Sequence, residues 1–437
     1  YEGGALLLHN YTWTPEEGDV DVVLRHHDNE DHNNKNHIVN NGGLTSTGIS
    51  RFDKNTEFYW RFSNNPTYTL TGFGVLSKPE QGPVLPHQLF IDDENGKNAN
   101  TATLWMQLRY IDFSAAMGYQ SVLVDALWDK QIGRDKIEEL AKYGKNKGVA
   151  LYLWYNSNGY WNDAPQTPRS IMDNAIARRK EMKWMQSIGI RGIKVDFFGG
   201  DKQMTMQLYE DILSDANEYG LLVIFHGCTL PRGWERMYPN FASSEAVLAS
   251  ENLHFSQGSC DNEAFNATLH PFIRNTVGSM DFGGSALNKY YNADNAPRGS
   301  RRVTSDVYAL ATAVLFQSPV QHFALAPNNL TDAPSWAIDF MKEVPTTWDE
   351  VRFIDGYPGK YVILARRHGD KWYIAGVNAQ KETLKLKVNL PMFSNGEKVR
   401  LFSDDKALQG GVKQIEIGKK QELQLAIPCN GGVLITK

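Results

Sequence analysis

A lysine and an aspartate stand two residues apart within residues 192–198, which have the sequence GIKVDFF. The β-branched and aromatic residues of this segment, bounded by glycines, predict a short buried strand. Because side chains alternate between the two faces of a strand, we expect Lys194 and Asp196 on the same face. An acid and a base on one face form either a structural ion pair or a reactive site, and this segment alone favours neither.

Polar or aromatic residues end four successive apolar strands, which are predicted at residues 121–128, 149–156, 192–198 and 221–226. The residues at those ends are Asp125, Trp128, Trp154, Asn156, Asp196 and His226. Catalytic groups of a βα barrel lie at the C-terminal ends of its strands, so this set predicts a polar pocket with aromatic walls.

Three members of this set have a second interpretation. Asp125 could bind a hydroxyl group of a substrate or could only cap its strand. For Trp128 and Trp154, a place in the hydrophobic core is as good an interpretation as a wall on which a sugar stacks.

Two further carboxylates, Glu245 and Glu251, lie in the otherwise uncharged residues 241–252. Each could be a metal ligand, a proton donor or a solvated loop acid. Glycoside hydrolysis needs a pair of carboxylates: one attacks the anomeric carbon or activates water, and the other protonates the leaving oxygen. We expect Asp196 to stay ionised beside Lys194, which suits a nucleophile, and the partner acid to have a raised pKa in an apolar loop.

The elements that would position these residues are helices and strands that alternate from about residue 105 to residue 342. Continuous apolar strands separated by helices predict a parallel sheet that is covered on both sides. The number of units fits an α/β fold of the (β/α)8 barrel type at residues 76–342. A doubly wound open sheet is the alternative, although no glycine-rich phosphate-binding sequence follows any strand.

The regions before and after the predicted barrel are rich in strand patterns. Residues 1–75 predict an N-terminal β-rich segment, a partial β-sandwich, and residues 77–86 predict a linker. The histidine-rich segment at residues 26–37 is interpreted as a solvated loop rather than a metal site, because it has no fixed ligand spacing. Residues 343–437 contain six short alternating segments and predict a C-terminal antiparallel β-sandwich.

Composition argues against several classes of function. The chain of 437 residues has a net charge of −5, so no nucleic-acid surface is expected. No apolar run is long enough to span a membrane. The three cysteines are widely spaced and predict neither a disulfide framework nor a zinc site.

The motifs and their order resemble glycoside hydrolase family 97 over roughly residues 105–437. The similarity rests on GIKVDFF, on FHG at residues 225–227, and on EAV and EN, which begin at Glu245 and Glu251. It implies an exo-acting α-glycosidase with an N-terminal β-sandwich, a catalytic barrel and a C-terminal β-domain. The resemblance also implies a periplasmic or secreted enzyme that binds Ca²⁺ and acts on an oligosaccharide or another glycoside.

The same resemblance implies roles for individual residues. Retaining members of the family, similar to α-galactosidases, carry the nucleophile at the position of Asp196. Inverting members lack this carboxylate and carry a glutamate after the histidine of the fifth strand, where this chain has Gly227 after His226. Glu251 corresponds to the acid/base, and Glu245 and Glu251 are the expected metal ligands. The expected substrate-binding residues are Lys194, His226, Trp154, Asp125 and Trp128.

Three activities stay open at this point. The first is a retaining α-galactosidase that forms a covalent glycosyl-enzyme. The second is a β-L-arabinopyranosidase, because β-L-arabinopyranose differs from α-D-galactose only at the exocyclic carbon. The third is an inactive carbohydrate-binding protein or a fragment, because the N-terminal domain of the family is far longer than the roughly 75 residues present before the barrel. The oligomeric state is not predicted.

Overall fold

The computed structural model describes five short strands before residue 78 and then residues 104–159, 162–292 and 295–437, with side chains described from residue 107 on. Contacts divide the chain into two compact units, Tyr1–Met106 and Gln107–Lys437, and each is described by itself. The predicted domain boundaries at residues 75 and 342 stay predictions. The predicted histidine-rich loop lies outside the described residues, as does nearly all of the predicted linker.

The described strands of the first unit confirm that this part of the chain contains β-structure. Three of them form an antiparallel sheet in the order β1-β4-β5, and β2 pairs separately with β3. Their bounds are β1 Tyr11–Trp13, β2 Val20–Arg25, β3 Glu57–Phe62, β4 Tyr68–Thr71 and β5 Val75–Ser77.

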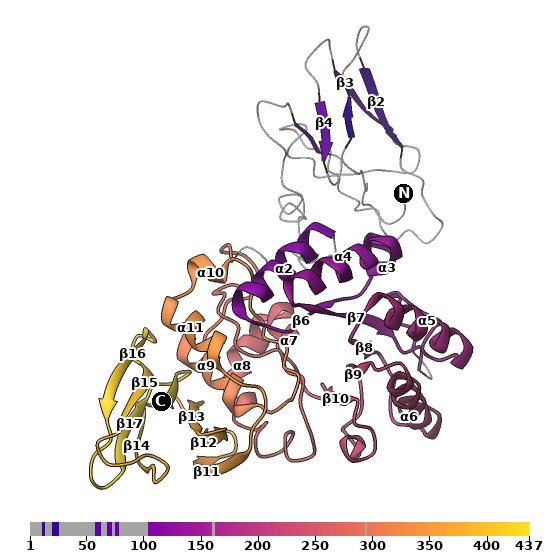
Figure 1. The fold of residues 1–437 in the computed structure, drawn as a ribbon. Coiled ribbons are helices and arrows are strands. Elements are labelled where there is room, and N and C mark those ends of the chain that lie inside the picture. The colour runs from indigo at the N-terminus through magenta and orange to yellow at the C-terminus, as the bar shows by residue number, and fades with distance from the viewer. Residues whose placement is uncertain are drawn as a thin grey trace. The chain divides into compact units, whose positions relative to one another are not determined.

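The second unit begins with a five-stranded parallel sheet in the order β10-β9-β8-β7-β6 (Figure 1). All four apolar strands predicted around the polar residues are present, and β10 is added at the edge. The central strand β8 is buried over its whole length. The bounds are β6 Ser121–Val124, β7 Ala150–Asn156, β8 Gly192–Asp196, β9 Leu222–Phe225 and β10 Phe241–Ser244.

Helices connect these strands, as expected for parallel neighbours. Two of them, α4 and α5, end at glycines in the left-handed conformation, Gly148 and Gly189. Helix α5 begins six residues later than predicted because the side chain of Asn174 caps it by accepting a hydrogen bond from the backbone N–H of Ala177. The helices of this part are α2 Leu104–Met117, α3 Trp128–Gln131, α4 Arg134–Lys147, α5 Ala175–Ile188 and α6 Gln203–Glu218.

The eight-stranded barrel is not confirmed in the described part of the chain. Beyond β10, the sheet continues only as an isolated parallel bridge between Ser244 and Met280. Single hydrogen bonds then join residues 280–284 to residues 317–324, from Met280 N to Gln317 O and from Ala324 N to Gly284 O. Residues 283–300 are rich in glycine, asparagine and serine, which favour turns over strands. The sequential strand order is nevertheless compatible with a barrel and lacks the reversal of a doubly wound sheet.

Helix α9, Asp306–Leu315, packs against the C-terminal sheets within the second unit. Every residue from Val307 to Leu315 is buried. Its side chains share one hydrophobic core with Phe340, Leu364, Tyr373 and Leu434, among others. The remaining helices of this region are α7 Glu251–Phe255, α8 Gln257–Ala267, α10 Asn329–Asp332 and α11 Ser335–Glu343, and a short 3-10 helix covers Trp234–Arg236.

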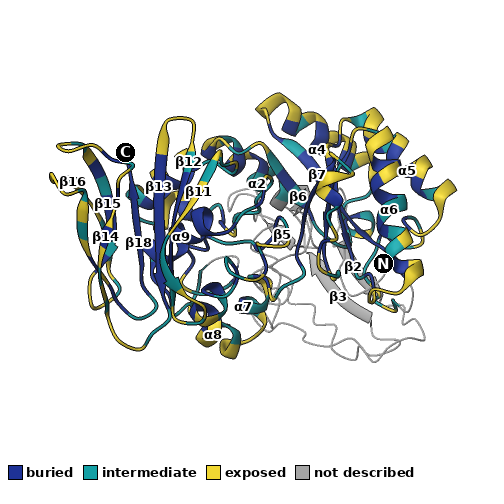
Figure 2. Ribbon diagram, turned by 90° about the horizontal axis from the view of Figure 1, so that it is seen from below, coloured by how far each residue is buried: buried dark blue, intermediate teal, exposed yellow. Residues whose placement is uncertain are grey.

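The predicted C-terminal antiparallel β-sandwich is confirmed. Its larger sheet has the order β11-β12-β13-β18-β15-β16, and its smaller sheet is the pair β14-β17. A second core fills the space between the sheets. Strands β13 and β18, which contribute to it, are mostly buried in Figure 2. The strands are β11 Glu350–Tyr357, β12 Tyr361–His368, β13 Lys371–Asn378, β14 Leu384–Asn389, β15 Lys398–Asp404, β16 Gly410–Glu416, β17 Glu422–Ile427 and β18 Gly432–Thr436.

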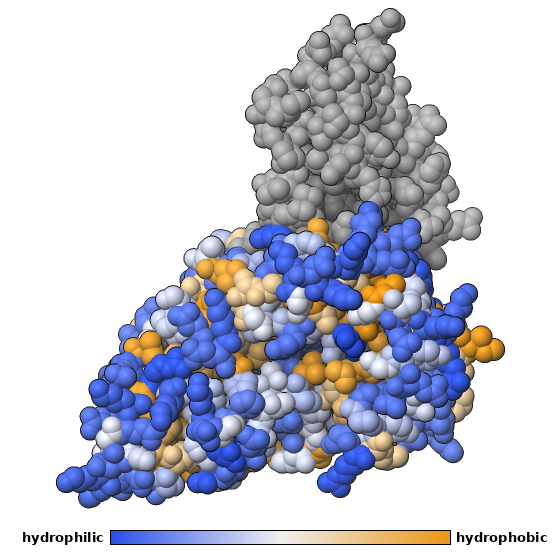
Figure 3. Space-filling view, in the orientation of Figure 1, coloured by the Kyte–Doolittle hydropathy of each residue, from blue (hydrophilic) through white to orange (hydrophobic). Residues whose placement is uncertain are grey.

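The surface of the second unit is mainly hydrophilic in the view of Figure 3, with apolar side chains scattered between charged ones. Among the helices that the structure describes, none combines the length and the apolar character that crossing a membrane requires.

Candidate active site

The polar residues predicted at the strand ends come together at one edge of the parallel sheet. Asn156 at the end of β7 pairs with Asp196 at the end of β8, and Trp154 pairs with Lys194. His226 directly follows β9, and Glu245 directly follows β10. Because the strands are parallel and in register, their carboxyl ends bring these side chains to the same side of the fold.

Asp196 is buried, and each oxygen of its carboxylate accepts a hydrogen bond. The backbone N–H of Phe197 donates to Oδ1 at 2.8 Å, and the indole Nε1 of Trp154 donates to Oδ2 at 3.1 Å. Phe197 has a φ of 65°, a left-handed conformation that is costly for an aromatic residue. In this conformation the backbone N–H of Phe197 donates to the Asp196 carboxylate.

Lys194 is a buried cation between carboxylates. Its Nζ lies 3.1 Å from Oδ2 of Asp125 and 3.9 Å from Oδ2 of Asp196. Burial alone would lower the pKa of Lys194, but the carboxylates of Asp125, Asp196 and Glu251 outweigh burial and raise it. Burial would likewise raise the pKa of Asp125, yet Lys194 brings it below its usual value. Lys194 therefore stays charged and orients both aspartates.

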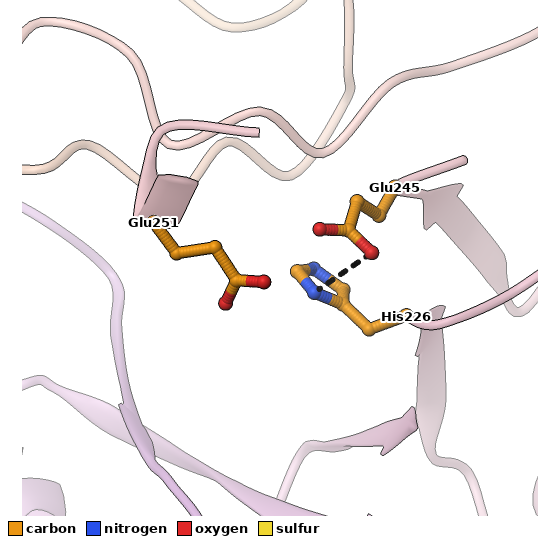
Figure 4. A group of neighbouring side chains, drawn as sticks. All are labelled: His226, Glu245 and Glu251. Carbon is orange, nitrogen blue, oxygen red and sulfur yellow. Dashed lines mark ion pairs between the residues drawn. The ribbon is translucent and has the colours of Figure 1, made fainter. Parts of the chain in front are cut away.

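His226 is held by a buried carboxylate that sequence reasoning missed. Its Nε2 lies 2.7 Å from Oδ2 of Asp281, and its Nδ1 lies 3.6 Å from Oε2 of Glu245 (Figure 4). Burial and Lys194 lower the pKa of His226, but Asp281 and Glu245 raise it more, so the net pKa is raised. A signal for Asp281 exists in the sequence: it stands between Met280 and Phe282, an acid within a short apolar run like the one around Asp196.

Glu245 is held from two sides. Its Oε2 accepts a hydrogen bond from the backbone N–H of Gly227 at 3.1 Å. The buried guanidinium of Arg274 donates to the backbone oxygens of Glu245 and Ser244, at 3.0 and 2.7 Å. Burial is the main reason why the pKa of Glu245 is raised, and the neighbouring Glu251 adds to it, whereas His226 opposes it. Arg274, also not foreseen from the sequence, thus fixes the backbone that presents this carboxylate.

Glu251 is the first residue of helix α7 and is exposed. Ligand atoms of His226, Glu245 and Glu251 all lie within 4.8 Å of one another. Calcium takes oxygen ligands, so the two carboxylates fit this ion. His226 fits it less well, because a ring nitrogen is not an oxygen donor and its Nε2 already bonds to Asp281. The described donors therefore suit a partial calcium site made by Glu245 and Glu251, with His226 as an orienting neighbour.

The two tryptophans proposed as sugar-stacking walls are both buried but differ in the partner of the indole N–H. Strand β6 ends at Val124, earlier than predicted, and Trp128 instead begins helix α3. Trp128 is fully buried, stacks on Trp184, and donates its indole N–H to the backbone oxygen of Trp154 at 2.9 Å. Its burial supports the core interpretation. Trp154 is also buried, but its N–H reaches Asp196, so it contacts the site through that carboxylate.

Family profiles of known proteins match two parts of the chain. Residues 86–247 match the family profile described as Glycoside hydrolase 97, and residues 347–436 match the one described as Glycosyl-hydrolase 97 C-terminal, oligomerisation. Together the two matches span more than half of the chain.

Two curated relatives are similar to the chain in sequence. A probable retaining alpha-galactosidase of Streptomyces bingchenggensis is 32% identical over 65% of the chain and 42% of its own length. A retaining alpha-galactosidase of Bacteroides thetaiotaomicron is 30% identical over 61% of the chain and 40% of its own length. The chain thus spans less than half the length of these relatives.

Solved structures extend the comparison. A crystal structure of a beta-arabinopyranosidase has 61% sequence identity and a TM-score of 0.75, over 77% of this chain and 53% of that one. A glycoside hydrolase family 97 enzyme from Pseudoalteromonas sp. strain K8, solved in complex with acarbose, shares the fold with a TM-score of 0.62 at 20% identity, over 77% of this chain and 56% of that one. The two profile matches and these relatives identify the chain as a member of glycoside hydrolase family 97.

Proposed function

We propose that the chain carries the catalytic centre of a retaining exo-glycosidase that hydrolyses terminal sugars with the ring configuration of galactose. The observation that carries this proposal is the Asp196 carboxylate, which the N–H groups of Phe197 and Trp154 hold at the end of β8. Asp196 would attack the anomeric carbon and form a covalent glycosyl-enzyme, which water then hydrolyses. Glu251 would protonate the leaving oxygen in the first step and take a proton from water in the second.

The surrounding residues would orient these two carboxylates and the sugar. Lys194 bridges Asp125 and Asp196, so it would hold the charge of the nucleophile in place. Partly exposed Asp125 is the candidate for a sugar hydroxyl, since its side chain is 43% accessible while Lys194 holds its other side. His226 and Trp154 act through Glu245 and Asp196, which makes them positioning residues.

Glu245 and Glu251 are proposed to hold Ca²⁺. The ion, when bound, would supply positive charge that polarises a sugar oxygen. Calcium takes six to eight oxygen ligands, so water or other residues would complete its shell. Export to the periplasm or beyond is also proposed, on the basis of the family alone.

Two sugars fit the proposal about equally. The curated relatives favour α-galactosides, whereas the solved structure with 61% identity is a beta-arabinopyranosidase and favours β-L-arabinopyranosides. These sugars share the ring configuration and differ only at the exocyclic carbon, so the space around that carbon selects between them.

The test is to incubate the protein with the p-nitrophenyl glycosides of α-D-galactopyranose and β-L-arabinopyranose and to follow the released anomer by NMR. The expected first product is the retained anomer, and the faster substrate identifies the enzyme. Asp196→Ala should lose this activity, and azide should restore turnover as a glycosyl azide of inverted configuration. Release of the inverted anomer by the wild type would contradict the role of Asp196. A folded protein that binds sugar without turnover, and that a fluoro-sugar fails to label, would be a binding protein.

A further inference from the structure

The imidazole of His322 is fixed at one nitrogen and open at the other. Its Nδ1 lies 3.0 Å from both carboxylate oxygens of Asp281. The side chain of Asp281 is only 2% accessible, whereas that of His322 is 28% accessible. Within the described residues, Nε2 of His322 has no hydrogen-bond partner.

His322 stands beside the proposed catalytic centre. Oδ2 of Asp281, one of the two oxygens near His322, also lies 2.7 Å from Nε2 of His226, so both rings reach the same carboxylate. Val320, two residues before His322, packs against Tyr152 and Ile224.

Tyr152 and Ile224 lie on the same side of the parallel sheet as the site. They precede Trp154 and His226 by two residues along β7 and β9, and residues two apart share a face of a strand. The segment around Val320 therefore crosses the face of the sheet from which Lys194 and Asp196 project. His322 reaches Asp281, the partner of His226 at the carboxyl end of β9.

The bond to Asp281 decides what the free nitrogen can do. An ionised carboxylate only accepts, so Nδ1 of His322 must be the protonated nitrogen. The pKa of Asp281 lies far below its usual range, because the two histidines outweigh burial, which alone would raise it. Nε2 is then an acceptor in the neutral ring and a donor in the charged ring, and a sugar hydroxyl can match either one.

We propose that His322 is a further substrate-binding residue, whose Nε2 binds a hydroxyl group of the sugar held beside Asp196. Asp281 is its positioning residue and orients His322 and His226 together. This inference rests on the proposed function, because the ligand is the glycoside that the site would hydrolyse.

Two substitutions separate a substrate contact from a structural one. His322→Asn keeps a donor near the position of Nδ1 and so still satisfies Asp281, but it removes Nε2. His322→Gln places its amide near the position of Nε2 and gives up the bond to Asp281. A matched control is His368→Asn, because His368 also bonds through Nδ1, at 2.8 Å to the oxygen of Thr347, but lies in the C-terminal sandwich.

We expect His322→Asn to lower kcat/KM for the better glycoside about 10-fold, the effect of one hydrogen bond to substrate. His322→Gln should stay closer to the wild type, within about 3-fold, and His368→Asn should be unchanged. A set of deoxy-sugar substrates then identifies the hydroxyl. The substrate that lacks the contacted hydroxyl should have the same kcat/KM with the wild type and with His322→Asn. Full activity in His322→Asn together with loss in His322→Gln would overturn the proposal, because only the bond to Asp281 would then matter.

Calorimetric titration of the full chain with free D-galactose and L-arabinose separates this inference from the proposed function. If the wild type binds either sugar without turnover, the enzyme assignment fails while weaker binding by His322→Asn still supports the contact. Equal binding by wild type and His322→Asn would overturn the contact even if turnover is confirmed. No binding and no turnover in the folded wild type would overturn both.

Discussion

Gly227 leaves the space that the Asp196 carboxylate occupies. A Cβ atom at position 227 would lie 2.8 Å from Oδ1 of Asp196 and 2.7 Å from the backbone nitrogen of Phe197. The same glycine donates its N–H to Glu245 and accepts a hydrogen bond from the N–H of Phe198. A side chain at position 227 would therefore clash with the Asp196 carboxylate in its present position.

Gly227→Ala is therefore expected to displace Asp196. Displacement of a reacting group by about 1 Å can cost on the order of 100-fold in rate, so we expect kcat to fall by about that factor. The control is Gly220→Ala, at the other end of β9, because Gly220 also has a positive φ but no atom within 4 Å of the added Cβ. Both variants carry the same kind of backbone strain, and Gly227→Ala carries the steric clash in addition. Equal kcat in the two variants would contradict the steric role of Gly227.

Trp154→Phe should weaken catalysis more than folding. The change retains an aromatic ring beside Phe197, whose ring centroid lies 5.8 Å away, but removes the indole N–H from Asp196. A hydrogen bond to a charged group contributes about 1.5–3 kcal/mol, so kcat/KM should fall roughly 10- to 100-fold. Trp184→Phe is the comparison, because its N–H bonds to Glu138 on the exposed face of the helices. The assigned role of Trp154 is wrong if both variants have the kinetics of the wild type.

Calcium should stabilise the folded chain through Glu245. An ion that binds only the folded state adds about 2.7 kcal/mol at a free concentration 100-fold above Kd. We expect the melting temperature to rise when calcium replaces a chelator, and to rise less in Glu245→Gln. Glu416→Gln, an exposed glutamate of β16, should respond like the wild type. If the wild type melts at the same temperature in both buffers, Glu245 serves only as a partner of His226 and Gly227.

Glu263 makes stability depend on pH. Burial raises the pKa of this carboxyl to about 7, although a hydrogen bond from Thr304 and the charge of Arg302 oppose the rise. The folded state therefore holds the proton more tightly than the unfolded chain, in which the pKa is about 4.5. The stabilisation is complete below pH 4.5 and is lost as the pH rises through 7, by up to about 3 kcal/mol.

Urea unfolding at pH 5 and pH 8 measures this dependence. The free energy of unfolding of Glu263→Gln should change less between these pH values than that of the wild type, because the amide does not ionise. Asp261→Asn, an exposed position of the same helix α8, should retain the slope of the wild type. If Glu263→Gln has the same dependence of unfolding free energy on pH as the wild type, another group causes that dependence.

The local pattern of residues was enough to predict the strands and their shared edge. Apolar runs such as residues 149–156 and 192–198 form strands because β-branched and aromatic side chains pack well in a buried sheet. The alternation rule placed Lys194 and Asp196 on one face, and the structure has their charged atoms 3.9 Å apart. The C-terminal sandwich followed from the same alternation, because one buried face forces a period of two.

Contacts between distant segments could not be predicted in this way. Trp128 belongs to the core because α3 begins there and brings it against Trp184, and no local pattern encodes that packing. Closure of the sheet beyond β10 is likewise not visible in residues 283–300, which lack apolar periodicity.

The chemistry of the site shows the same division. The residue types at the strand ends were enough to indicate a carboxylate-based site, because each follows directly on its own strand. Asp281 reaches His226 across 55 residues of sequence, and Arg274 reaches Glu245 across 29. Such partners depend on how the chain returns to the sheet, and burial then requires each charge to find a counterpart. Only the tertiary structure decides which carboxylate holds which histidine, and why position 227 must lack a side chain.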